Sequence, residues 1–168
     1  VVNRALEEVN RRVVRQIRAL GGQAVGITPR QKVIVAEPHA RSSELGYVGS
    51  VAWVQTRVIR RVFMRHMIPV ISPVGTGHGT LYNINADDVA SAVAASLRAE
   101  KLVLLTNVRG IFNGRSLIPT LSIKDAKRFV ERLVIQEGMI PKVKACIQAL
   151  QRGVKKTHVI DASIPHAL

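Results

Sequence analysis

Short apolar runs that alternate with helical segments constrain the fold of this chain more than any other feature. Residues 68–74 are apolar on both faces, as the central strand of a parallel sheet requires. Residues 101–106 have the character of a second buried strand, and 157–162 that of a last strand. Helical patterns at 85–99 and 141–153 separate these runs. The alternation predicts an α/β fold, a three-layer sandwich with helices on both faces of a mostly parallel central sheet.

The remaining segments extend this alternation. Apolar residues recur at helical spacing over 2–20, and Gly21-Gly22 ends that helix. No internal repeat or linker interrupts the chain, so we expect residues 1–168 to form a single domain. The further elements that we expect are strands at 24–27, 32–37 and 47–54, a basic amphipathic helix at 55–66, a loop or short hairpin at 107–121 marked by Asn113-Gly114, and a helix from Ser122 to about Val134.

Composition limits the class of protein. Hydrophobic residues make up 47% of the 168 positions, which argues against disorder. No apolar run approaches the ~18 residues that a membrane-spanning helix needs. There is no secretory signal pattern, and the single cysteine, Cys146, cannot form an internal disulfide. These features favour a cytoplasmic protein.

One interpretation of the formal net charge of +14 is a nucleic-acid or anionic-surface partner. Basic charge by itself supplies only non-specific attraction to nucleic acid. Only 4% of the residues are aromatic, which supports a base-stacking surface poorly. We therefore expect a solvated basic surface rather than specific nucleic-acid binding.

Two segments place polar side chains where a helix begins. Tyr82-Asn83-Ile84-Asn85-Ala86-Asp87 follows a Gly-rich segment, 75–79, that we expect to be a flexible active-site turn. Gly138-Met139-Ile140-Pro141-Lys142 opens another helix with its lysine in the first turn. Backbone N–H groups at a helix N-terminus favour anions such as phosphate. Amide, carboxylate and ammonium groups at such positions suit phosphoryl transfer, in which positioning and charge neutralisation do most of the catalysis.

In this order, these motifs resemble those of the N-acetylglutamate kinases of the amino-acid-kinase family. The match continues through segments over nearly the whole chain, at 46–49, 68–73, 101–106, 158–161 and 165–168. The resemblance implies an amino-acid-kinase fold and transfer of the γ-phosphoryl of ATP to the side-chain carboxylate of N-acetyl-L-glutamate, in arginine biosynthesis. It also implies Mg²⁺ bridging the phosphates and a homo-oligomer for the complete protein. The five histidines show no ligand spacing, so we expect no structural metal.

The resemblance also implies roles for individual residues. Lys142 would contact the terminal phosphates of ATP, and Asp87 would orient the catalytic lysines; helix capping is the alternative role for Asp87. Asn83 would hydrogen-bond acetylglutamate, beside Asn85, which we expect to be the structural member of this substrate-side pair. The residues that we expect to contact the nucleotide are Thr106, Asn107, Gly110, Met139 and Lys142.

Some positions depart from the family pattern. Asn107 stands where the family usually has an Asp that helps to hold the nucleotide, so one charge is lost. The Lys-x-Gly-Gly loop that touches the transferring phosphoryl group has no match, so the chain resembles the C-terminal, nucleotide-side portion of a kinase. Three alternatives stay open: a catalytically inactive regulatory domain, a sibling kinase acting on acetylaminoadipate or another small acid, and a basic nucleic-acid-binding protein.

Overall fold

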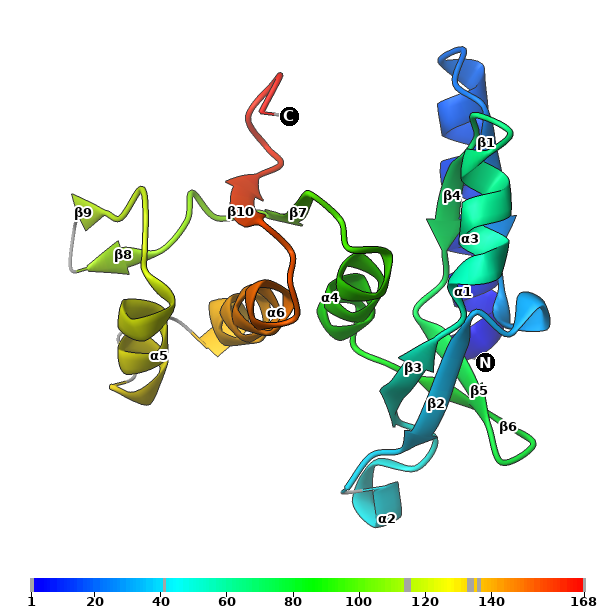
Figure 1. Cartoon of the computed structure of the whole chain (residues 1–168), viewed down its shortest axis with the longest axis horizontal. Helices are drawn as coiled ribbons and strands as arrows, with labels where there is room; N and C mark the ends of the chain where they lie inside the picture. Colours follow the sequence, from blue (N-terminus) through cyan, green and yellow to red (C-terminus); the bar gives the residue numbers. More distant parts are fainter. Residues whose placement is uncertain (1, 41, 114–115, 133–134, 136, 168) are drawn as a thin grey trace. The chain divides into compact units, whose positions relative to one another are not determined.

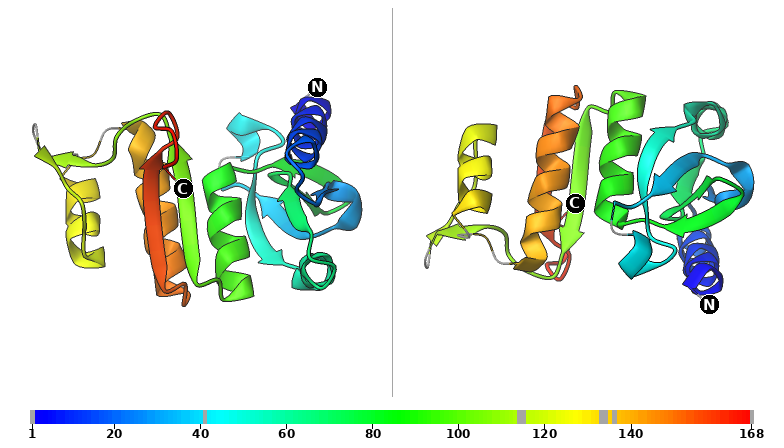
Figure 2. Two further views of the ribbon diagram at one scale, coloured as in Figure 1. Left: turned by 90° about the horizontal axis from the view of Figure 1, so that it is seen from above. Right: turned by 90° about the horizontal axis from the view of Figure 1, so that it is seen from below.

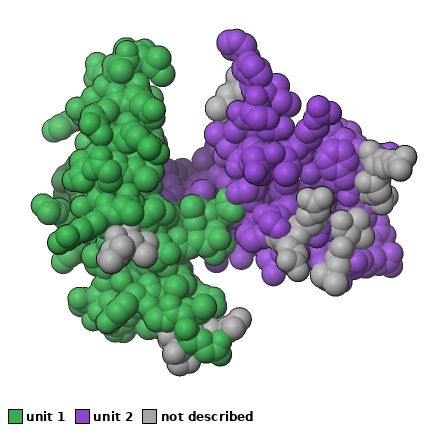
Figure 3. Space-filling view, turned by 180° about the vertical axis from the view of Figure 1, so that it is seen from behind, with its two compact units in different colours: residues 1–89 green, residues 90–168 purple. Residues whose placement is uncertain are grey.

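The computed structural model describes residues 2–40, 42–113, 116–132, 135 and 137–167. Its internal contacts divide the chain into two compact units, residues 1–89 (unit 1) and 90–168 (unit 2) (Figure 3). Each unit has strands and helices of its own. The predicted single domain stays a prediction, and two predicted features, the Gly114 part of the hairpin turn and the helix end near Val134, lie outside the described residues.

Unit 1 contains strands of two sheets, with helices before and between them (Figure 1). Strands β1 and β4 form a parallel pair, and the other four form a mixed sheet in the order β3-β2-β5-β6. Its elements are α1 (Val2–Ala19), β1 (Ala24–Ile27), the 3₁₀ helix η1 (Pro29–Gln31), β2 (Ile34–Pro38), α2 (Ser42–Leu45), β3 (Gly49–Val54), α3 (Thr56–Phe63), β4 (Ile68–Ile71), β5 (Val74–Gly77), β6 (Thr80–Asn83) and the start of α4 (Ala86–Leu97).

Two side chains of α1 bond to the parallel pair of unit 1. Asn10 is buried, and its Nδ2 donates a hydrogen bond of 2.8 Å to the Val70 carbonyl of β4. Arg18 donates from Nε and Nη2 to the Ala24 carbonyl of β1, at 3.0 and 2.7 Å. Gly26 of β1 allows the Asn10 side chain to lie close to this strand, because a Cβ at position 26 would collide with Asn10 Oδ1. The helix is therefore fixed to both strands by polar contacts as well as by its apolar face.

The predicted single strand at 68–74 is wrong in its extent. It divides into β4, which pairs with β1, and β5, which belongs to the mixed sheet. Ser72-Pro73 lies at the break, and a proline cannot donate to a strand ladder. The burial prediction also fails for β4, whose residues are half-buried or exposed.

The Gly-rich segment is not a simple turn. Residues 74–83 form the antiparallel hairpin β5–β6, in which Gly77 pairs with Thr80. His78 and Gly79, the two residues between the strands, have φ angles of 49° and 72°. Two successive positive φ values are typical of the type I′ turn, whose twist matches that of the flanking strands. The segment is therefore part of an ordered hairpin that ends at Asn83.

Unit 2 is built around one parallel strand pair, β7 and β10, which lie side by side (Figure 2). Leu102 and Leu104 of β7 are buried in a cluster with small residues of α4 and α6, such as Ala94 and Ala145. The elements of this unit are the rest of α4, β7 (Lys101–Thr106), β8 (Phe112–Asn113), β9 (Ser116–Leu117), α5 (Ile123–Glu131), η2 (Glu137–Met139), α6 (Ile140–Gln151) and β10 (Lys156–Asp161).

Most predicted elements of unit 2 are confirmed. The strand at 101–106 has the predicted bounds, and a short hairpin lies within the predicted 107–121 segment. Ser122 caps α5, since its Oγ accepts a 3.1 Å hydrogen bond from the Asp125 backbone N–H. Helices that alternate with parallel strand pairs confirm the α/β fold class. Among the described residues, none of the helices has both the length and the apolar character to cross a membrane.

We predict that Asn10→Ala destabilises unit 1 by about 1–3 kcal/mol, because the Val70 carbonyl then loses its buried donor. Urea unfolding followed by tryptophan fluorescence measures this change, since Trp53 in unit 1 is the single tryptophan of the chain. Gln16→Ala, at an exposed position of the same helix, is the control and should shift the free energy of unfolding by less than about 0.5 kcal/mol. Equal effects of the two substitutions would contradict this role of Asn10.

Candidate functional site

The carboxyl ends of β7 and β10 bring the predicted nucleotide-side residues together with an acid. The parallel register pairs Thr106, the last residue of β7, with Asp161, the last residue of β10. The Ala162 N–H donates a 2.8 Å hydrogen bond to the Thr106 carbonyl, which continues the ladder past the strand end. Asn107 and Gly110 follow directly in the loop after β7. Ligands of open α/β sheets bind at this end of the strands.

Asp161 was not among the predicted site residues, although an acid at the end of an apolar strand was a signal in the sequence. The residue is only 7% exposed. Its Oδ1 accepts hydrogen bonds from the Ser163 hydroxyl at 2.6 Å and from the Ser163 backbone N–H at 2.9 Å. These two bonds, assisted by the charge of Arg109, hold the pKa of the Asp161 carboxyl below its usual value. The site therefore contains a fixed negative charge.

The start of α6 packs against the loop that follows β7. Met139, at the end of η2, is buried in a cluster to which Val108 and Ile111 of that loop also belong. The Met139 side chain therefore belongs to the hydrophobic core, and only the backbone of this residue remains for a nucleotide contact. Pro141 lies in the first turn of α6, where no intrahelical N–H bond is lost. The half-buried Lys142 follows it, so its helix terminus and the 107–111 loop form one packed region.

In unit 1, the predicted acceptor-side residues lie where β6 leads into α4. Asn83 ends β6, and its backbone N–H donates to the Tyr47 carbonyl at 2.9 Å. The side chains of both residues are exposed, with Tyr47 at 75%. Unit 1 thus presents an exposed amide on Asn83 and an exposed aromatic ring on Tyr47, two residues that a backbone hydrogen bond joins.

Asn85 has a structural function in this turn. Its Oδ1 accepts hydrogen bonds from the backbone N–H groups of Asp87 and Asp88, at 2.8 and 3.3 Å. This is the geometry of an N-cap, and it satisfies two of the N–H groups that a helix leaves unpaired at its start. The contact agrees with the expectation that Asn85 is the structural member of the pair, and its contact with substrate stays a prediction.

The two predicted catalytic residues belong to different units. Asp87 is a half-buried residue in the first turn of α4, within unit 1, and Lys142 is in unit 2. Their approach to one another therefore stays a prediction. Among the described residues, no group of three or more His, Cys, Asp or Glu side chains could hold a metal ion.

We predict that Ser163→Ala raises the pKa of Asp161 toward its usual value, because the alanine removes the hydroxyl donor. A lowered pKa in the folded state stabilises the fold above the unfolded-state pKa, and this stabilisation is lost as the pH falls through the folded-state pKa. The variant should therefore be less stable at neutral pH, and the difference should shrink in acid. NMR titration of the Asp161 carboxyl and unfolding at several pH values measure both effects.

Ser116→Ala, at an exposed position of β9, is the control for the Ser163 variant. It should leave the Asp161 titration unchanged. An unchanged Asp161 pKa in Ser163→Ala would show that the hydroxyl bond does not stabilise the carboxylate.

Comparison with known proteins identifies the family. The sequence profile of the amino acid kinase family matches residues 1–161. The acetylglutamate kinase of Desulforamulus reducens is 42% identical over 176 aligned positions, which include all of this chain and 61% of that protein. The acetylglutamate kinase of Kosmotoga olearia is 43% identical over 163 positions, with 96% of this chain and 58% of that protein covered. The chain thus spans about 60% of the length of these curated relatives.

A solved structure has the same fold. The crystal structure of smu.665 from Streptococcus mutans UA159 superposes with a TM-score of 0.83 at 28% identity, over 95% of this chain and 69% of that one. The family match covers far more than half of the chain, and the fold is partial relative to that of the longer relatives. The chain therefore belongs to the amino acid kinase family and has its α/β fold.

Proposed function

We propose that this chain is the nucleotide-side part of an acetylglutamate kinase, which transfers the γ-phosphoryl of ATP to the side-chain carboxylate of N-acetyl-L-glutamate. The relatives from Desulforamulus reducens and Kosmotoga olearia support the choice of substrate within the family. One structural observation supports it most: the 107–111 loop after β7 and the start of α6 with Lys142 are parts of one packed region of unit 2. Such a region offers hydrogen-bond donors and a cation to a polyphosphate.

In this proposal, the nucleotide lies at the carboxyl edge of β7 and β10. Lys142 neutralises the charge that develops on the transferring phosphoryl group. Thr106 and Asn107 offer a hydroxyl and an amide to the nucleotide, and Gly110 leaves room for a backbone contact. Asn107 contributes no charge, while Asp161 holds its carboxylate on the neighbouring strand. The negative charge of this edge thus lies on β10 rather than directly after β7.

The acceptor lies beside the turn between β6 and α4 in this proposal. The exposed Asn83 amide hydrogen-bonds N-acetyl-L-glutamate, and Asn85 holds the turn through its contacts with the α4 backbone. Asp87 orients Lys142.

The protein forms no covalent bond to the reactants in this reaction. A carboxylate oxygen of the acceptor forms a bond to the γ-phosphorus, the bond from that phosphorus to the β-phosphate oxygen breaks, and an acyl phosphate and ADP result. Because both reactants are anions, alignment and charge neutralisation lower the barrier. Bound Mg²⁺ would supply further neutralisation, held mainly by the phosphates, as that ion commonly is.

We predict that Lys142→Ala lowers turnover about 10²–10³-fold in a protein of the relatives' full length that carries this sequence, because one charge contact with the transition state is lost. The Michaelis constant for N-acetyl-L-glutamate should change much less. Lys142→Arg should rescue only in part, since a planar guanidinium does not replace a compact ammonium. A hydroxamate assay for the acyl phosphate measures both constants.

Lys144→Ala is the matched control, because Lys144 is exposed on the same helix. It should leave turnover within about twofold of the unchanged protein. A Lys142→Ala variant with normal turnover and weak affinity for acetylglutamate would move this lysine into the acceptor site. Activity with acetylaminoadipate but not acetylglutamate would identify the sibling kinase instead.

A further inference from the structure

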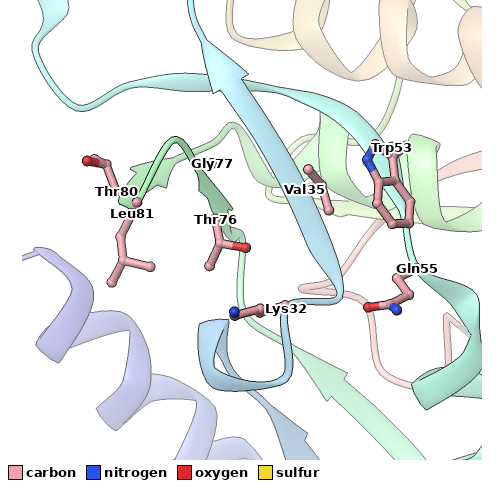
Figure 4. Close-up of a pocket in the computed structure, with 9 residues that line it drawn as sticks. Lys32, Val35, Trp53, Gln55, Thr76, Gly77, Thr80 and Leu81 are labelled. Atoms are coloured by element: carbon pink, nitrogen blue, oxygen red, sulfur yellow. The ribbon is translucent and has the colours of Figure 1, made fainter.

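A concave site lies wholly within unit 1, on the mixed sheet. It has a cavity volume of about 500 Å³, within the range of small-molecule sites. Four of its side chains come from four adjacent strands: Trp53 of β3, Val35 of β2, Thr76 of β5 and Leu81 of β6. The strand register pairs each with the next, so they form one row on one face of the sheet (Figure 4).

The opposite face of this sheet is the core of unit 1. Ile34 and Ala36 of β2, Val54 of β3 and Tyr82 of β6 are all buried. Successive side chains along a strand point to opposite faces of the sheet. Trp53, Val35, Thr76 and Leu81 therefore point away from the core. Trp53 is 55% exposed and Leu81 is 39% exposed, so the row is an open and mainly apolar surface.

An irregularity in β3 fixes the position of the tryptophan. Val35 pairs with Trp53, but the next residue, Ala36, pairs with Val51. Ala52 is thus an extra residue on β3, which is a β-bulge. Bulges commonly redirect a neighbouring side chain, and here one lies directly beside Trp53. The bulge in β3 therefore accounts for the exposed position of the Trp53 ring.

The polar groups of the cavity are few and point to an anion. Lys32 is the single charged residue among those that line it. In the described parts of the chain, its ammonium has no hydrogen bond or ion pair. Gln55 lies near the same end as Lys32, and the Thr76 and Thr80 hydroxyls complete the polar lining (Figure 4). One cation beside an apolar row matches a molecule with one anionic group and one flat apolar group.

We propose that this cavity binds a small aromatic or similarly flat carboxylate, with the carboxylate on Lys32 and the ring on the row that contains Trp53. The ring would bury apolar surface against Trp53, Val35 and Leu81. The carboxylate would gain a charge-assisted hydrogen bond. The proposal concerns unit 1 alone and does not rest on the proposed kinase activity.

Trp53 supplies the readout, because it is the only tryptophan of the chain. Phenylacetate is the probe, phenylacetamide its uncharged counterpart, and acetate an anion without a ring. We expect phenylacetate to change the Trp53 emission saturably, phenylacetamide to bind at least about tenfold more weakly, and acetate to have no saturable effect. NMR shifts at Thr76 and Thr80 should follow the same titration.

Lys32→Met should weaken phenylacetate binding about tenfold and leave phenylacetamide binding within about twofold. A structural role of Lys32 would affect the binding of both probes, whereas its charge affects only the binding of phenylacetate. Lys101→Met, at an exposed position of unit 2, is the matched control and should change neither. Leu81→Ala should weaken both aromatic probes.

Three results would overturn the proposal. The first is equal binding of phenylacetate to the unchanged protein and to Lys32→Met. The second is the absence of any saturable response to phenylacetate. The third is a Trp53 emission that changes with protein concentration alone, which would assign this face to a second copy of the chain.

Discussion

The parallel pairing of β7 with β10 is the constraint on which the proposed nucleotide site depends. It places Thr106 beside Asp161 at one edge, and the Ala162–Thr106 hydrogen bond of 2.8 Å continues the ladder beyond the strands. Small residues on α4 and α6 permit close packing against Leu102 and Leu104. A shift of one residue in this register would move Asp161 to the other face and separate it from the loop after β7.

Short polar contacts serve structure and chemistry at once. Asn10 fixes α1 to β4, Asn85 caps α4 before Asp87, and Ser163 stabilises the Asp161 carboxylate. In each case a short side chain bonds to backbone or to a near neighbour, where little entropy is lost on ordering. Of the two proposed catalytic residues, Asp87 thus lies in a first helical turn that the Asn85 cap holds in place, as preorganised catalysis requires.

The sequence predicted most elements, because apolar periodicity and helix caps are local signals. Residues 101–106 and the Ser122 cap were found with the right bounds. The break between β4 and β5 was missed, because apolar continuity from 68 to 74 concealed a change of sheet at Ser72-Pro73. The place of Asp161 beside Thr106 and the row containing Trp53 were missed as well, since both depend on pairing between strands far apart in sequence. Such pairing is a tertiary property that single-sequence patterns do not carry.

Hydrogen–deuterium exchange of residues 1–168, with and without saturating Mg²⁺ and a non-hydrolysable ATP analogue, tests the nucleotide-side assignment most directly. Bound nucleotide should slow exchange of backbone amides at 106–111 and 138–144, because these segments form one packed region in unit 2. Exchange in the β5–β6 hairpin should change little. Protection confined to unit 1, with no change at either segment of unit 2, would contradict the assignment.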